Sequence, residues 1–373
     1  MTVTEKLRQY LMVDPTNSEL ALQLIESLAV EGKTRDALEF LQTFYNAEEH
    51  DFRFLAWSAH LHLALSQFEN AIENYQTLFA MGHIHQAHQI NCAYAYYYNS
   101  NCTAALDLLN ECHSSEPEHI LLKARCMSDA DELAPVIEML NETDFSSSND
   151  KIVSDKKGLL SLLYLDNGDY TQAQKFSAET LDKDEENFDA RLVKASLSLF
   201  KFDIENAVTD VNLLYNVYPS IGRVIVLKAL LEMSLKNFVA ALELYKQACT
   251  LMPEHVGTRV NLAWCHFLTG NIDLAEVTFE EAIKIDRTFS EGHGGLSLIK
   301  SKQEKWIESK ELARTALKLD KNCASALFSR ALYLKNIGRD NEANLIMNGL
   351  VGSKSEMTGK SLKNIILESL RIG

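Results

Sequence analysis

Small residues recur along the chain at a fixed interval, and apolar residues at helical spacing surround them. One set of small residues, the first column, is spaced by 34 residues or a multiple of 34: Ala37, Ala71, Ala105, Ala173, Ala207, Ala241, Ala275 and Ala343. Ser309 and Met139 occupy the two positions at which this spacing has no alanine. A second column precedes members of the first by twelve residues and comprises Ala59, Ala93, Ser161, Ala195, Ala229, Ala263, Ser297 and Ala331. Small residues at two fixed phases predict two closely crossing helices in every repeat. Such pairs must stack, because none can bury its apolar face alone.

The turn residues support a pair of helices in each repeat. In residues 256–289, apolar residues at helical spacing fall in 262–266 and, after a turn at Gly270, in 275–283. The same turn position holds Gly32, Gly168 and Gly338, and we expect a left-handed residue there at the end of the first helix. One position near the close of the second helix, where proline stops a helix, holds Pro117, Pro219 and Pro253.

These residues resemble the tetratricopeptide repeat family. The family pattern places a Leu–small pair at positions 7–8, aromatic residues at 11 and 24, alanines at 20 and 27, and proline at 32. Matches occur at Leu262-Ala263, Ala275, Phe279 and Ala282, at Leu160-Ser161, Tyr164, Gly168-Asp169-Tyr170 and Ala173, and at Ala241, Tyr245, Ala248 and Pro253. The resemblance implies an all-α, right-handed superhelical α-solenoid of antiparallel helix pairs, with about ten tandem repeats.

The repeat frame gives a predicted domain organisation, with Ser18 as position 1 of repeat 1. Residues 1–17 form a half-repeat helix, residues 18–119 form repeats 1–3, and residues 154–357 form repeats 5–10. Residues 358–373 form a C-terminal capping helix. Residues 120–153 are a degenerate repeat, because Met127 and Met139 replace its small residues and Pro135 falls early in its second helix. We expect this degenerate repeat to act as a hinge.

Charge divides the chain at the degenerate repeat. Residues 1–150 carry 23 acidic and 7 basic side chains, whereas residues 151–373 carry 29 of each. An acidic lobe favours basic protein partners and disfavours nucleic acid and anionic lipid, although it could equally serve solubility alone. No leader pattern and no apolar run of about 18 residues is found, which predicts a cytoplasmic protein without membrane insertion.

The first helices should line a concave groove, at positions 2, 5, 9, 12 and 13 of each repeat. This stripe and position 6 supply the candidate partner-binding residues Arg53, His60, Asn91, Tyr94, Tyr97, Tyr98, Arg125, Phe200, Leu230, Asn261, Trp264 and Leu268. Their apolar and aromatic character indicates a groove for a peptide. Packing between neighbouring first helices is an equally good explanation.

One ligand mode of the resembled family is disfavoured. Its carboxylate clamp would need five specific side chains, and only Asn91 and Arg125 match, with Arg53, Trp57 and Leu121 at the other places. An unpaired carboxylate in an apolar groove would be costly.

Metal and cofactor binding are not expected. Cys92 and Cys126 replace packing leucines, no Cys-x-x-Cys pair exists, and the cysteines behave as buried reduced thiols. The early histidines point in different directions in the repeat frame, with His60 on the groove stripe, His62 in the packing layer, and His83 and His85 between repeats.

Catalysis is not expected either, and the chain is predicted not to be an enzyme. Residues 292–295, Gly-His-Gly-Gly, open a first helix without the strand and Gly-Lys-Ser/Thr ending of a phosphate loop. Glycines there more plausibly loosen the helix or allow close approach.

The predicted function is that of a scaffold, adaptor or chaperone which binds a protein or peptide in its groove. A non-catalytic regulatory or substrate-recruiting subunit of an enzyme or secretion machine is the alternative. An RNA-binding helical repeat is a third possibility, disfavoured by the acidic lobe.

Overall fold

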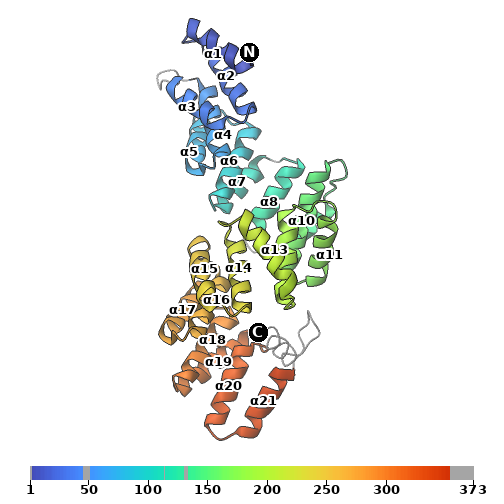
Figure 1. The fold of residues 1–373 in the computed structure, drawn as a ribbon, viewed down its shortest axis with the longest axis vertical. Helices are drawn as coiled ribbons and strands as arrows, with labels where there is room; N and C mark the ends of the chain where they lie inside the picture. Colours follow the sequence, from blue (N-terminus) through green and yellow to red (C-terminus); the bar gives the residue numbers. More distant parts are fainter. Residues whose placement is uncertain (1, 45–50, 113, 130–132, 353–373) are drawn as a thin grey trace. The chain divides into compact units, whose positions relative to one another are not determined.

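The computed structural model describes residues 2–44, 51–112, 114–129 and 133–352. Within these residues every regular element is an α-helix, as the repeat pattern predicts. The chain divides into two compact units, an N-terminal unit, Met1–Asn167, and a C-terminal unit, Gly168–Gly373 (Figure 1). The capping helix predicted for 358–373 lies outside the described residues.

The N-terminal unit holds the first ten helices of the described chain. They are α1 (Val3–Val13), α2 (Ser18–Val30), α3 (Thr34–Phe44), α4 (Phe52–Ala64), α5 (Phe68–Ala80), α6 (Gln86–Tyr98), α7 (Cys102–Cys112), α8 (Pro117–Asp129), α9 (Leu133–Glu142) and α10 (Asp150–Asp166). Each helix from α1 to α9 packs against the next along the chain, and α10 packs against α8 and α9.

The C-terminal unit continues the same two-helix rhythm in its described part. Its helices are α11 (Tyr170–Leu181), α12 (Phe188–Phe200), α13 (Ile204–Val217), α14 (Gly222–Ser234), α15 (Phe238–Leu251), α16 (Val256–Leu268), α17 (Ile272–Ile285), α18 (Ser290–Lys302), α19 (Trp306–Leu319), α20 (Ala324–Asn336) and α21 (Asp340–Gly352). Consecutive helices pack together, and α12, α16 and α18 also contact the next first helix of the array.

A left-handed residue ends the first helix of nine repeats. These residues all occupy position 15 and have φ between +57° and +83°: Gly32, Ser66, Ser100, Gly168, Phe202, Lys236, Gly270, Glu304 and Gly338. The prediction for Gly32, Gly168 and Gly338 is therefore confirmed. The degenerate repeat differs, since its position 15 is Ala134 within α9.

The prolines follow the prediction in two of three repeats. Pro219 and Pro253 each lie two residues beyond a second helix, after α13 and α15. The prediction was wrong for Pro117, which is the first residue of α8 rather than the stop of α7. Proline fits this place because the first residue of a helix needs no N–H donor.

The small-residue columns lie where the two helices of a repeat cross. Ala71, Ala241 and Ala275 have no exposed surface. Ser309 fills the same position in repeat 9 and is also fully buried. Its hydroxyl lies 2.7 Å from that of Ser301 and 2.9 Å from that of Ser329, so the extra polar atom is satisfied.

The segment that follows α9 is held by specific contacts. Phe145 is buried at 4% exposure, the Lys156 ammonium lies 4.6 Å from its ring centroid, and the same ammonium donates to the Thr143 carbonyl at 2.8 Å. Asn149 caps α10 by accepting from the Ile152 N–H at 3.0 Å. The hinge role of residues 120–153 remains a prediction, which limited proteolysis cutting first within 144–150 would support.

Candidate partner-binding site

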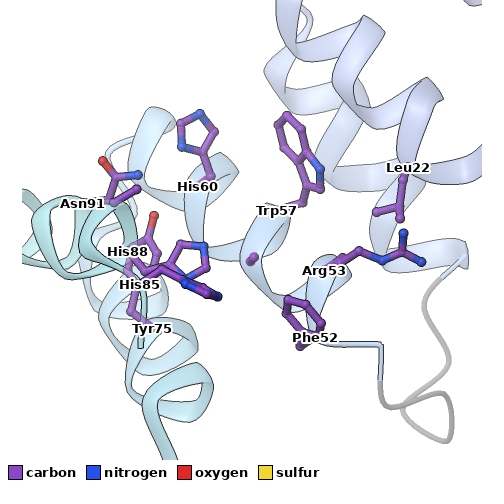
Figure 2. A pocket seen from close by; sticks show the side chains of 11 residues that line it. Leu22, Phe52, Arg53, Trp57, His60, Tyr75, His85, His88 and Asn91 are labelled. Atoms are coloured by element: carbon purple, nitrogen blue, oxygen red, sulfur yellow. The ribbon is translucent and has the colours of Figure 1, made fainter. Parts of the chain in front are cut away.

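A pocket of about 590 Å³ opens in the N-terminal unit among α2, α4 and α6. Its lining comes from the first helices of repeats 1–3, their linking residues and one second helix: Leu22, Phe52, Arg53, Ala56, Trp57, His60, Tyr75, His85, Ala87, His88 and Asn91 (Figure 2). We call this the N-terminal pocket. It brings together three of the predicted groove residues, Arg53, His60 and Asn91, and no carboxylate lines it.

Helix α4 supplies the largest share of the lining because of its spacing. Phe52, Ala56 and His60 are four residues apart, as are Arg53 and Trp57, so all lie on one side of the helix. The half-buried Trp57 packs against the apolar core of α2 and α3 and meets the His60 ring edge-on at 5.7 Å. Figure 2 shows its indole between the Leu22 side and the His60 side of the pocket.

Arg53 is already engaged by two carboxylates. Its Nε lies 3.0 Å from Asp51 Oδ1, one terminal nitrogen lies 2.7 Å from Asp51 Oδ2, and the other lies 2.6 Å from Glu19 Oε1. Hydrogen bonding from Arg53 lowers the pKa of Asp51 below its ordinary value. A guanidinium whose charge is shared in this way is a weak receptor for a further carboxylate, which agrees with the departures from the clamp motif.

Tyr75 leaves an unsatisfied polar atom at the base of the pocket. Its side chain has no exposed surface, and its hydroxyl has no hydrogen-bond partner of normal geometry among the described residues. Burial raises the pKa of this phenol, and the nearby Asn91 amide acts in the opposite direction. A buried hydroxyl without a partner is costly, so a ligand group that reached it would gain a hydrogen bond.

Two histidines close the other side of the pocket. The His85 and His88 rings lie 5.4 Å apart and edge-on, and His88 also lies 6.2 Å from Tyr75. Burial lowers the pKa of His88 below 6.5, so its ring is neutral at pH 7. The pocket thus combines aromatic rings with polar groups, and the charge of its Arg53 is shared with Asp51 and Glu19.

A comparison with protein families identifies the repeat. Residues 232–299, from the end of α14 into α18, match the model of the tetratricopeptide repeat family. The described helices on either side have the same paired arrangement and the same buried small residues. Residues 232–299 are therefore identified as tetratricopeptide repeats. Protein–protein interaction is the general role of arrays of this kind.

Solved structures with similar arrays exist, at low sequence identity. A chain of the crystal structure of the APC/C hetero-tetramer Cut9–Hcn1 is 11% identical with a TM-score of 0.48, over 90% of this chain and 81% of that chain. The Pseudomonas aeruginosa protein pilF is 16% identical with a TM-score of 0.43, over 58% of this chain and 98% of that chain. Neither likeness bears on what this chain binds. No curated protein matches the sequence.

The remaining predicted residues of the N-terminal unit do not line this pocket. Tyr94 and Tyr97 are half-buried and pack against the core of α6, α7 and α8, whereas Tyr98 is 56% exposed. Arg125, on α8, is close enough to Tyr94 to act against the rise that burial causes in the phenol pKa. These tyrosines therefore extend the aromatic surface of α6 beyond the pocket.

The predicted residues of the C-terminal unit lie on α12, α14 and α16. Trp264 is half-buried against Phe279, with ring centroids 5.2 Å apart, and Leu230 packs against the core of repeat 7. Asn261 is half-buried, while Phe200 and Leu268 are 36% and 46% exposed at the ends of their helices. Part of this stripe is therefore core packing, the second explanation open from the sequence.

Eight pocket residues were not among the predicted groove residues. Leu22, Ala56 and Ala87 lie on the predicted stripe, whereas five others do not: Phe52, Trp57, Tyr75, His85 and His88. They fall at positions 1, 6, 24, 34 and 3 of their repeats, outside the predicted stripe. Trp57 was noted only as a departure from the clamp. The early histidine cluster was a usable signal, since His60, His85 and His88 do share the lining.

Metal and membrane chemistry find no support among the described residues. No group of three His, Cys, Asp or Glu side chains in the described ranges could hold a metal ion. None of the seven cysteines, all within the described residues, is in a disulfide bond. Burial raises the pKa of Cys92 and of Cys265 to about 12, which keeps both thiols protonated. No helix of the described chain is long and apolar enough to cross a bilayer.

Proposed function

We propose that this protein is a scaffold whose N-terminal pocket receives a segment of a protein partner. The observation that carries the proposal is the pocket itself, about 590 Å³ in volume, with half-buried aromatic rings around the unpaired Tyr75 hydroxyl. An aromatic cavity with a few convergent polar groups is the usual form of a site for an anchoring side chain.

The partner segment should carry an apolar or aromatic anchor and basic flanking residues. The anchor follows from Phe52 and Trp57, whose rings offer contact area with little loss of conformational freedom. The basic flanks follow from the charge of the whole unit, since residues 1–167 contain 25 acidic and 10 basic side chains. The acidic field would raise the rate of encounter, while the aromatic pocket would hold the anchor.

Two other roles fit the same array. As a non-catalytic regulatory or substrate-recruiting subunit, the chain would use the pocket to hold a partner that is part of an enzyme or a secretion machine. As an RNA-binding repeat, it would need a basic face, which the N-terminal unit does not offer. Identification of the bound partner separates a regulatory or substrate-recruiting subunit from a general scaffold. Salt-dependent retention of the chain on RNA would support the RNA-binding role.

The test uses the full chain immobilised in an extract of the native cell. Asn91→Ala and His60→Ala change pocket residues without removing a fully buried side chain. We expect both to reduce retention of the principal partner at least fivefold, as quantified by mass spectrometry. Leu345→Ala, at a 74% exposed position of α21, is the control and should leave retention unchanged.

Direct binding to the pocket can be followed through Trp57. The chain has three tryptophans, so Trp264→Phe with Trp306→Phe leaves Trp57 as the only reporter. Basic peptides with one aromatic residue should change its fluorescence, and peptides lacking that residue should not. Unchanged partner retention in both pocket variants, together with a silent Trp57, would show that the partner binds elsewhere.

A further inference from the structure

Two pockets of the C-terminal unit occupy the same place in different repeats. One, of about 480 Å³, lies between α19 and α20, and the other, of about 380 Å³, lies between α11 and α12. Both are lined by positions 21, 24, 25 and 28 of one repeat and by positions 7, 10, 11, 14 and 16 of the next. A recurring location indicates a common structural cause.

The common cause is a small residue at position 24. In three other repeats this position holds an aromatic residue, Tyr75, Tyr245 or Phe279, each with no exposed surface, so the ring fills the space between neighbouring repeats. Ala313 stands there in repeat 9 and Ser177 in repeat 5. The missing aromatic ring leaves a cavity, and both small residues line one.

The two pockets differ in charge. The α19–α20 pocket is lined by Lys310, Arg314, Lys318, Arg330 and Arg339, with no carboxylate in the lining. We call it the basic pocket. In the α11–α12 pocket, by contrast, Lys201 donates to Gln174 at 2.6 Å, and Asp203 is part of the lining.

The positive charge of the basic pocket is only partly neutralised. Arg339 pairs with Glu342 through contacts of 2.5 and 2.6 Å, and Arg314 lies 3.5 Å from Glu311. Lys310 lies over the Tyr333 ring at 5.4 Å. The two remaining cations of the lining are Lys318 and Arg330, and both are exposed. Neither forms an ion pair with another residue in the described part of the chain.

The floor of the basic pocket is apolar. Ala313 and Leu334 are buried at 3% and 5% exposure, and Leu317 packs beside Ala313 in the same cluster. Ile337 lies at the edge, 45% exposed. An apolar floor within a ring of cations suits a ligand that combines one large apolar group with several negative charges.

We propose that the basic pocket binds an acidic peptide segment of a partner protein, with an aromatic or large aliphatic side chain placed over Ala313. The anchor would take the space that an aromatic residue fills in other repeats. Aspartate and glutamate side chains of the segment would pair with Arg314, Lys318 and Arg330. This site is separate from the N-terminal pocket and does not depend on the function proposed for it.

Other occupants fit the chemistry less well. The Lys310 ammonium lies over the Tyr333 ring at 5.4 Å, so a base that stacked on that face would have to displace it. The C-terminal segment 353–373 carries four basic and two acidic residues, so its charge does not complement the pocket. A second copy could contribute its acidic N-terminal unit, and the experiment distinguishes that case.

The experiment measures fluorescence anisotropy of a labelled peptide of about twelve residues, mostly Glu and Asp with one central Phe, added to the full chain. We expect saturable binding that weakens as NaCl rises from about 0.05 to 0.5 M. Arg314→Glu with Arg330→Glu should raise Kd at least tenfold. Ala313→Phe should do the same by filling the floor without changing charge, and a peptide with Ala in place of Phe should bind at least fivefold more weakly.

Matched controls separate the pocket from general charge effects. Lys284→Glu with Arg287→Glu makes the same charge change at two exposed positions of repeat 8 and should leave Kd within twofold. Ser177→Phe fills the α11–α12 pocket and should have no effect either.

Three results would overturn the proposal. One is a peptide Kd that Ala313→Phe leaves unchanged. Another is equal weakening by the pocket and control charge reversals. The third is that the acidic peptide does not bind, while the chain binds RNA or associates with itself and the Arg314→Glu and Arg330→Glu changes abolish that binding.

Discussion

Two successive interfaces of the C-terminal unit show what one side chain does in this array. Between repeats 8 and 9, Phe279 is fully buried and its ring lies against Gly295 of α18. Between repeats 9 and 10, Ala313 takes the same position, and the basic pocket opens beside it. In these two interfaces, the residue at position 24 separates a closed core from a ligand-sized space.

The filled interface is adjusted on both sides of the contact. A Cβ at Gly295 would lie 2.2 Å from Phe279 Cε1 and 2.3 Å from Cζ, so only glycine admits the ring. A Cβ at Gly294 would likewise lie 2.6 Å from Cys323 Sγ. Close approach, one of the two explanations that the sequence left open, is thus the structural reason for Gly294 and Gly295 at the start of α18.

The largest effect should follow from emptying the filled interface. Phe279→Ala removes a fully buried ring and leaves a cavity, so we expect the free energy of unfolding to fall by about 3–5 kcal/mol. The measurement is the urea midpoint of unfolding. Leu274→Ala, at a 52% exposed position on the same helix, is the control and should change stability by less than about 0.5 kcal/mol. Equal losses in the two variants would mean that the ring does not hold the interface closed.

A smaller loss should follow from adding one methyl group at the same contact. Gly295→Ala would gain about 0.5–1 kcal/mol of helix propensity on an open surface. Here the clash with Phe279 should outweigh that gain and lower the free energy of unfolding by about 1–3 kcal/mol. In the Phe279→Ala background the same substitution should lose its cost, because the clashing ring is gone. A stabilising Gly295→Ala in the wild-type background would contradict the contact.

Replacing alanine by leucine should lower the free energy of unfolding at a closed position and leave it almost unchanged at an open one. Ala241 has no exposed surface and lies in the core formed with Tyr245, so Ala241→Leu should cost about 1–3 kcal/mol by overpacking. Ala313→Leu faces an existing cavity and should change stability by less than about 0.5 kcal/mol. Thermal unfolding of the two variants checks this difference. Similar costs would show that the space at Ala313 closes in solution.

Much of the fold could be predicted from the sequence because the repeat is a local pattern. Small residues at two positions of each repeat predicted the helix pairs, and the glycines at position 15 predicted the left-handed residue that ends the first helix. Ser66, Phe202 and Glu304 adopt the same conformation without being glycine. The packing of the helix pair imposes it there, against their intrinsic preference, so no residue type signals it.

The sites could be predicted only in part. Arg53, His60 and Asn91 fell on the expected first helices, but the sequence did not show that Arg53 is held by Asp51 and Glu19. The basic pocket was missed altogether. A small residue such as Ala313 gives no signal by itself, because only the surrounding volumes show whether neighbours fill the space it leaves.

The smallest expected effect concerns acid stability of the filled interface. Lys300 of α18 lies 2.5 Å from Glu276 of α17, and hydrogen bonding from Lys300 lowers the pKa of Glu276 below its ordinary value of 4.5. Because the pKa of Glu276 is lower in the folded state, the unfolded chain takes up the proton at a higher pH than the folded chain does. The stabilisation is therefore complete above about pH 4.5 and is lost as the pH falls through the folded-state pKa. At the basic pocket, Glu311 and Glu342 pair with Arg314 and Arg339 on the exposed surface, where ion pairs contribute little to stability.

Glu276→Gln should test this difference without changing the size of the side chain. We expect the variant to lose less stability than the wild type between pH 6 and pH 3, as followed by urea midpoints across that range. Glu280→Gln, at an exposed position on the same helix, should keep the wild-type slope. If both variants show the wild-type slope, the Lys300–Glu276 ion pair between α17 and α18 contributes no proton-linked stability, and the packing at position 24 is the difference between the two interfaces that remains.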